Sequence, residues 1–90
     1  MKKHLDIKIY GEVQGVSFRY YSLEKAKELE LTGFTRNKPD GKVYIEVEGE
    51  EKSLDNFLGW CRRGPSWARV EKIEVKEGRI KNYKNFEVRY

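Results

Sequence analysis

The chain has 90 residues, which suits one small domain, so a single domain over residues 1–90 is expected. Apolar residues make up 38% of the sequence and are interrupted too often for a membrane span, while the single cysteine, Cys61, excludes an internal disulfide. The net charge of +4 favours anionic partners, either small anions or nucleic acid. No charged-then-apolar leader precedes the first strand, so we expect no secretory signal and a cytoplasmic location.

The N-terminal part of the sequence predicts a strand, a glycine-bracketed turn and a helix. Leu5, Ile7 and Ile9 alternate with polar residues, which is the two-residue period of a half-buried strand. Helical spacing follows at Phe18, Ser22, Ala26 and Leu29. The turn over residues 11–17 therefore ends where a helix begins, and the unpaired N–H groups of that helix are expected to bind phosphate or carboxylate.

Arg19 supports an anion site at this turn. An arginine in the first helical turn opposes the helix dipole at a cost of roughly 0.3–1 kcal/mol. The first carboxylate of the helix comes only at Glu24, so a bound oxyanion would supply the missing negative charge and accept the guanidinium fork. From these residues alone an ordinary turn remains possible, with Arg19 solvated or paired to a surface carboxylate.

The middle of the chain predicts a β-hairpin. Thr32-Gly33 is interpreted as the stop of the first helix, and residues 34–37 as a short strand that ends at Asn37. The tetrad Lys38-Pro39-Asp40-Gly41 predicts the turn. The second strand has one apolar face, formed by Val43, Ile45 and Val47.

The rest of the chain predicts a second helix and two strands. An apolar stripe at Leu54, Phe57, Leu58 and Cys61 indicates a helix, which ends at the basic, Gly- and Pro-containing run over residues 62–65. A strand follows over residues 70–75, and the different parity of Val70 and Ile73 predicts a β-bulge in it. Residues 86–90 form a last alternating segment, and residues 78–84 are the one stretch without a clear pattern.

This element order matches a ferredoxin-like α+β fold, a βαββαβ sandwich with a mixed, largely antiparallel sheet, two helices on one face and a short extra C-terminal strand. A right-handed crossover makes the first two strands parallel, with the third antiparallel between them. The turn and Asn37 then share one edge of the sheet, roughly 10 Å apart at the backbone.

Two motifs in register give the chain a specific resemblance. The segment GEVQGVSFR at residues 11–19 and the segment GFTRNKPDGKVYIEVEG at residues 33–49 resemble the two signatures of acylphosphatases. GPSWARV at residues 64–70 and FEVRY at residues 86–90 fit later strands of that family. The chain departs from the pattern at Ser17, where glycine is common, and at Ser66, where a second proline is common. Ser17 can cap the helix, so we expect the loop geometry to survive.

The resemblance implies the ferredoxin-like fold and metal-independent hydrolysis of acyl phosphates to a carboxylate and inorganic phosphate. It also implies that inorganic phosphate, the product, inhibits the reaction. It implies that Arg19 binds the phosphoryl group and that Asn37 orients the attacking water. The phosphate-binding loop corresponds to the backbone amides of Gln14, Gly15, Val16, Ser17, Phe18 and Arg19. No cofactor and no metal are implied, and we expect a monomer without a membrane partner.

A nucleic-acid-binding module is the main alternative, because RNA-recognition domains share this layout and stack bases on aromatic side chains of the first and third strands. Tyr10 and Tyr44 occupy such positions. Asp6, Glu46 and Glu48 share that face and would repel a phosphate backbone, so no nucleic-acid partner is expected. A regulatory domain that binds phosphate without turnover is the other alternative.

Other chemistry-bearing residues have simpler interpretations. His4, the one histidine, is expected to be exposed at the frayed start of the first strand, and Cys61 is interpreted as a small core residue. The acidic run is expected to face solvent on alternate strand positions rather than to bind a metal; it comprises Glu46, Glu48, Glu50 and Glu51. The first loop lacks the Gly-Lys-Ser/Thr ending of nucleotide-binding P-loops.

Overall fold

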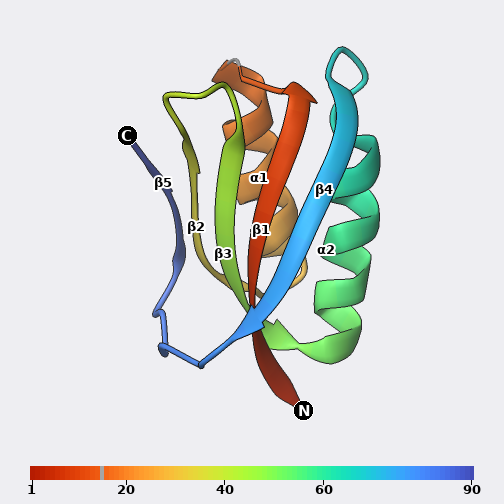
Figure 1. The fold of residues 1–90 in the computed structure, drawn as a ribbon. Coiled ribbons are helices and arrows are strands. Elements are labelled where there is room, and N and C mark those ends of the chain that lie inside the picture. Colours follow the sequence, from red (N-terminus) through yellow and green to blue (C-terminus); the bar gives the residue numbers. More distant parts are fainter. Residues whose placement is uncertain (15) are drawn as a thin grey trace.

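The computed structural model describes residues 1–14 and 16–90, apart from the side chain of Val16. Its seven elements follow the predicted order (Figure 1). They are β1 (Lys2–Glu12), α1 (Val16–Glu28), β2 (Thr32–Asn37), β3 (Val43–Glu50), α2 (Glu51–Arg63), β4 (Arg69–Gly78) and β5 (Phe86–Arg89). No helix in this described part of the chain is long and apolar enough to cross a bilayer.

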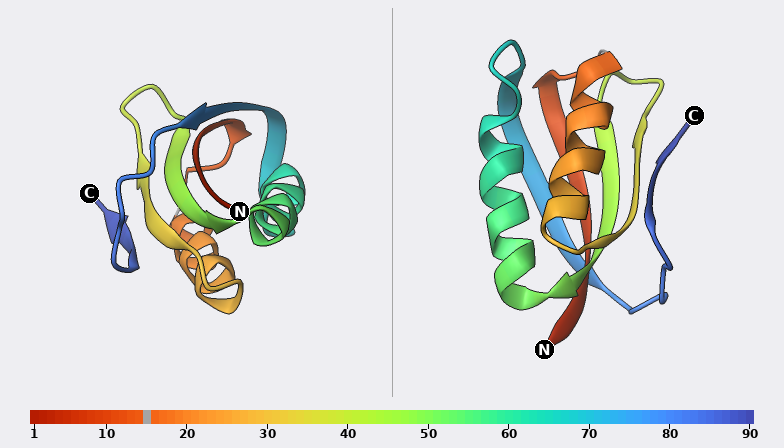
Figure 2. Two further views of the ribbon diagram at one scale, coloured as in Figure 1. Left: turned by 90° about the horizontal axis from the view of Figure 1, so that it is seen from below. Right: turned by 180° about the vertical axis from the view of Figure 1, so that it is seen from behind.

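The strands form one five-stranded sheet in the order β4-β1-β3-β2-β5. β3 pairs antiparallel with both β1 and β2, so β1 and β2 run parallel on either side of it. β4 pairs antiparallel with β1, and the short β5 pairs parallel with β2. Both helices cover the same face of the sheet (Figures 1 and 2). This arrangement confirms the predicted ferredoxin-like α+β fold.

The core lies between the helices and the apolar face of the sheet. Alternate residues of β1 and β3 supply the sheet side, as their two-residue period predicted, with Ile7, Ile9, Val43, Ile45 and Val47 fully buried. The stripe of α2 packs on them through Leu54, Phe57 and Cys61. Cys61 is fully buried, which confirms its interpretation as a small core residue, and this burial raises the pKa of its thiol.

The strand register places the predicted site at one edge of the sheet. Val43 of β3 lies opposite Ile9 of β1 on one side and opposite Asn37 of β2 on the other, so the three residues form a row across the sheet. β1 continues three residues beyond this row to Glu12, and α1 begins at Val16. The loop after β1 and the end of β2 therefore share one edge, as the crossover argument predicted.

Two local predictions had different outcomes. The interpretation of Gly33 as a helix stop was wrong, because α1 ends at Glu28 and Gly33 lies within β2 at a φ of 138°. A Cβ atom there would lie only 1.9 Å from the carbonyl oxygen of Glu46, so glycine permits the close approach of β3. The predicted bulge in β4 is confirmed, since the register of β1 and β4 shifts between Tyr10–Lys72 and Gly11–Val70.

Residues 79–85, which we call the strap, correct the predictions for His4, Glu46 and Glu48. The strap leads from β4 to β5 across one end of the sheet (Figure 1). Backbone N–H groups of Lys81 and Tyr83 donate to the carboxylate of Glu48, and Lys81 Nζ and Tyr83 OH donate to Glu46 Oε1. Glu48 is fully buried, while His4 and Glu46 are 1% and 8% exposed, instead of facing solvent.

Candidate active site

The start of α1 is fixed by its packing on the core. Phe18 is buried and its ring packs against Trp60 of α2, with 5.5 Å between the ring centroids. The Ser22 hydroxyl donates to the Phe18 carbonyl oxygen one turn back. The first four N–H groups of an α-helix have no partner within the helix, and in α1 these belong to residues 16–19. Four of the six predicted phosphate-binding amides are thus the free N–H groups of a helix N-terminus.

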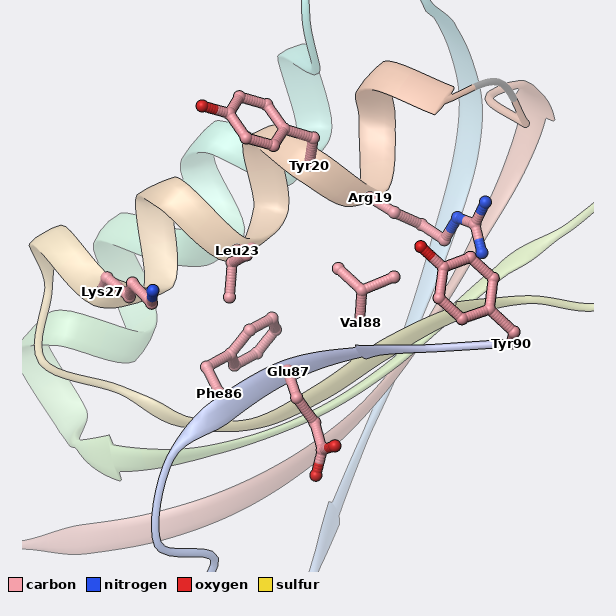
Figure 3. A pocket seen from close by; sticks show the side chains of 8 residues that line it. All are labelled: Arg19, Tyr20, Leu23, Lys27, Phe86, Glu87, Val88 and Tyr90. Carbon is pink, nitrogen blue, oxygen red and sulfur yellow. The ribbon is translucent and has the colours of Figure 1, made fainter.

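Arg19 lies half-buried at the base of this helix terminus. Its Nε is buried and has no hydrogen-bond partner among the described residues. The guanidinium lies over the ring of Tyr90, with 4.7 Å between Cζ and the ring centroid, and Figure 3 shows the two side chains side by side. No acidic residue lies in the first turn of α1, so its own helix turn offers Arg19 no carboxylate. The guanidinium is held in place by stacking while its donors stay available.

Asn37 ends β2 on the side of the sheet that the helices cover. It lies directly opposite Val43, whose side chain belongs to the core, and residues opposite each other in an antiparallel pair share a face. Within residues 1–14 and 16–90, Asn37 Oδ1 is buried and has no hydrogen-bond partner, and the same holds for Thr35 Oγ1 two residues earlier. Because a buried polar atom without a partner costs about 1–3 kcal/mol, these atoms indicate a place where a bound molecule is expected.

The side chain of Gln14 joins the first loop to the β2–β3 turn. Its Nε2 donates to the carbonyl oxygens of Lys38 and Lys42, at 2.5 and 3.0 Å. These two residues also pair with each other through their backbone, Lys38 N–H to Lys42 O, so the two acceptors lie together at the base of the turn. The turn begins directly after Asn37. Gln14 thereby ties the backbone that follows β1 to the hairpin that carries Asn37.

The family model for acylphosphatases matches residues 5–88. The chain belongs to the acylphosphatase family. An acylphosphatase of Archaeoglobus fulgidus is 49% identical over 86 residues, which cover 96% of this chain and 97% of the relative. The crystal structure of the acylphosphatase from Bacillus subtilis matches at 34% identity with a TM-score of 0.94 and full coverage of both chains. An acylphosphatase structure from Coxiella burnetii has the same identity and TM-score and covers 98% of this chain and 93% of that one.

In this acylphosphatase-family chain the predicted site residues come from the loop before α1, from the first turn of α1 and from the end of β2, at one edge of the sheet. Gln14 precedes α1, Ser17, Phe18 and Arg19 lie in its first turn, and Asn37 ends β2. Of the remaining loop amides, that of Val16 lies at the helix start, whereas the prediction for Gly15 falls outside the described residues. Their roles toward a substrate stay predictions.

Two contacts of this acylphosphatase-family site did not follow from the sequence. The amide of Gln14 was expected to act through its backbone, and its motif position gave no sign that the side chain bridges to the turn. The stacking of Tyr90 on Arg19 had no local signal, because the two residues are 71 positions apart and meet only through the pairing of β5 with β2.

Lys38 and Lys42, at the β2–β3 turn, each have their ammonium group near a tyrosine ring of the sheet. Lys38 Nζ lies 5.4 Å from the ring centroid of Tyr44, and Lys42 Nζ lies 4.7 Å from that of Tyr10. Both tyrosines belong to the face of the sheet opposite the helices. Lys42 also forms an ion pair with Asp40. The hydrogen bonds that Lys42 donates lower the pKa of the Asp40 carboxyl.

A cluster of possible metal ligands lies away from this edge. Single ligand atoms of His4, Asp6 and Glu46 come within 4.8 Å of one another. Each is already bonded, however. His4 Nε2 lies 2.8 Å from Asp6 Oδ1, and Glu46 Oε1 accepts hydrogen bonds from Lys81 Nζ at 2.9 Å and Tyr83 OH at 2.6 Å. Because Glu46 already pairs with the ammonium of Lys81, a structural role for the cluster is favoured.

Proposed function

We propose that this chain hydrolyses acyl phosphates to a carboxylate and inorganic phosphate at the edge formed by the α1 N-terminus, Arg19 and Asn37. One observation carries the proposal: Arg19, in the first turn of α1, and Asn37, at the same edge of the sheet, each have a buried polar atom without a partner in the part of the chain that the structure describes. A phosphoryl group with its attacking water supplies acceptors for Arg19 and a donor for Asn37.

In the proposed complex the phosphoryl oxygens accept hydrogen bonds from the amides at the start of α1 and from the Arg19 guanidinium. Phosphoryl transfer proceeds through a loose transition state, with charge spread over the equatorial oxygens. Catalysis then depends mainly on positioned donors and electrostatic stabilisation. The partial positive charge of the helix terminus and the full charge of Arg19 act on the same oxygens.

Asn37 orients the nucleophile in this proposal. Its side-chain oxygen accepts a hydrogen bond from a water molecule, whose oxygen attacks phosphorus as the bond from phosphorus to the acyl oxygen breaks. The leaving group departs as a carboxylate, which is stable without a proton near neutral pH, so no general acid is needed. The proton released by the water goes to the phosphate product. The proposal includes no resident metal or cofactor.

The proposal is tested by hydrolysis of benzoyl phosphate in excess chelator, with a phosphate monoester as the substrate control. We expect turnover of the anhydride alone. Arg19→Ala loses kcat/KM by about a thousandfold, because a guanidinium that stabilises transferring phosphoryl groups has effects of that order. Asn37→Ala loses kcat by about a hundredfold, the order expected for one positioned polar group, with KM and phosphate inhibition largely kept.

Arg36→Ala is the matched control for Arg19→Ala. Arg36 is also half-buried, and its Nε has no partner among the residues that the structure describes, but it lies on the opposite face of β2 from its neighbour Asn37, so we expect activity close to wild type. Phosphate binding without hydrolysis would instead support the non-catalytic alternative. Salt-sensitive binding of single-stranded RNA without hydrolysis would support the nucleic-acid alternative. The expected single domain, monomeric state and cytoplasmic location remain predictions.

A further inference from the structure

A groove runs between α1 and β5 and begins at Arg19. Its volume is about 590 Å³, and residues from both elements line it (Figure 3). Arg19 and Tyr90 stand at one end, Lys27 stands at the other, and Leu23, Phe86 and Val88 lie between them. The groove therefore begins at the guanidinium that is proposed to bind the phosphoryl group. From there it runs along the side of α1 that faces β5.

The local periods of the two elements give this groove an apolar middle. Arg19, Leu23 and Lys27 follow at intervals of four residues, so they form one row along α1. On β5, Phe86 and Val88 alternate with Glu87 and Arg89, and the apolar pair faces the helix. Glu87 also lines the groove, but its carboxylate is directed away from α1 in Figure 3 and its Oε1 lies 3.4 Å from Arg89 Nη2.

The charged residues that line the groove are a cation at each end, Arg19 and Lys27, and Glu87 on β5. Among the described residues no carboxylate lies within ion-pair distance of Lys27, whereas its helix neighbour Lys25 is paired with Glu28 at 2.6 Å. Lys27 lies eight residues after Arg19, which corresponds to roughly 12 Å along the helix axis at 1.5 Å per residue. The groove thus offers a positive group, an apolar stretch and a second positive group, in that order.

We propose that the acyl group of the substrate lies in this groove and that Lys27 binds a second anionic group at its distal end. The preferred substrates are then acyl phosphates whose carbon skeleton ends in a carboxylate or another anion. The skeleton covers Leu23 and Val88, and apolar contact of this kind is favourable because it removes surface from water. This inference rests on the proposed acylphosphatase function and adds the part of the substrate that is distant from phosphorus.

The test compares two rigid substrates of the same shape. Benzoyl phosphate carries no distal charge, and 4-carboxybenzoyl phosphate carries a carboxylate across the ring from the acyl phosphate. The measured quantity is the ratio of kcat/KM for 4-carboxybenzoyl phosphate to that for benzoyl phosphate, determined at low ionic strength. The variants are Lys27→Met, Lys27→Glu and Lys27→Arg, and Lys25→Met is the matched control on the same helix.

We expect wild type to have a ratio above one and Lys27→Met to lower it about three- to fivefold, the range of a partly exposed ion pair. Lys27→Glu lowers it further by repulsion, Lys27→Arg retains most of it, and Lys25→Met leaves it at the wild-type value. High salt reduces the ratio in wild type because exposed charges are screened.

The outcomes separate this inference from the function on which it rests. A ratio that is the same in wild type and Lys27→Met, while benzoyl phosphate is hydrolysed, overturns the role of Lys27 and leaves the proposed function intact. An equal fall of the ratio in Lys25→Met also overturns it, because the effect would then follow from net charge alone. If wild type hydrolyses neither substrate, the proposed function fails and this inference fails with it.

Discussion

At the scale of single residues, Arg19 is unusual both in its position in the sequence and in its surroundings in the structure. Its place in a first helical turn without acids is electrostatically unfavourable, and its buried Nε has no partner among the described residues. Either observation alone is compatible with an ordinary surface arginine. Together they describe a guanidinium that stacks on Tyr90 and whose Nε lacks a partner among the described residues, as expected of a group that binds an anion.

Gln14 permits a test of positioning at this scale. Because its Nε2 donates to two carbonyl oxygens of the turn after Asn37, Gln14→Ala releases the loop from the hairpin. We expect kcat/KM for benzoyl phosphate to fall about tenfold, since two ordinary hydrogen bonds correspond to about 1–3 kcal/mol. Gln14→Glu keeps the shape but turns a carboxylate toward the two carbonyl oxygens, so its activity is expected to be lower still.

The matched control for Gln14 is Asn56→Ala, which removes an exposed amide from α2. Steady-state kinetics and thermal unfolding of all three variants separate positioning from stability. A positioning role requires that Gln14→Ala loses kcat while its melting temperature stays within a few degrees of wild type. Activity of Gln14→Glu at the wild-type level would contradict the role, because that side chain has no N–H to donate.

At the scale of elements, the strap explains why polar residues occupy the face of the sheet opposite the helices. Glu48 Oε2 lies 2.7 Å from Nδ1 of His4, and the same carboxylate accepts the N–H groups of Lys81 and Tyr83. The strap is therefore bound to Glu48 through backbone donors and to Glu46 through the side chains of Lys81 and Tyr83. Its attachment also sets the start of β5, which forms one wall of the groove beside Arg19.

Removal of the Glu48 charge tests this attachment. Glu48→Gln replaces one acceptor oxygen by an NH2 group that cannot accept from the strap or from His4. We expect the free energy of unfolding to fall by about 3 kcal/mol, because buried donors lose a charged acceptor. Glu50→Gln, at an exposed position of the same strand, is the control and should change stability by less than about 0.5 kcal/mol.

Urea unfolding at pH 7 measures both changes. Equal midpoints for Glu48→Gln and wild type would show that the strap does not depend on the carboxylate. Because β5 follows the strap, loss of the strap contacts should also loosen β5. In Glu48→Gln we therefore expect the backbone amides of residues 86–89 to exchange their hydrogens earlier than those of β1.

At the scale of the whole molecule, the topology was predictable because it depends on local periods and on the handedness of one crossover. Alternation at Ile7 and Ile45 and the stripe of α2 predicted the elements, and their order left few arrangements. The strap was not predictable. Its contacts join residues 33 to 37 positions apart through side-chain acceptors, and a segment without apolar period gives no sign of where it binds. For the same reason His4 was wrongly expected to be exposed.

The pH dependence of stability follows from the same cluster and gives a prediction for the molecule as a whole. Burial alone would raise the pKa of Glu46, but hydrogen bonds from Tyr83, Lys81 and Tyr44 outweigh it and lower the pKa from 4.5 to about 2. A carboxyl whose pKa is lower in the folded state stabilises the fold above its unfolded pKa, and this contribution is lost as the pH falls toward the folded value. The contribution of Glu46 is thus complete above about pH 5 and disappears between pH 4.5 and 2.

Glu46→Gln isolates this contribution. At 1.36 kcal/mol per pKa unit the shift corresponds to at most about 3 kcal/mol, less in practice because the half-exposed ammonium of Lys81 is screened by solvent. We expect the variant to be less stable than wild type at pH 7 and the difference to shrink steadily as the pH is lowered from 4.5 to 2. Urea unfolding at pH 7, 4, 3 and 2 measures it. A difference that stays constant over this range would mean that the Glu46 charge does not contribute, since a neutral packing effect does not titrate.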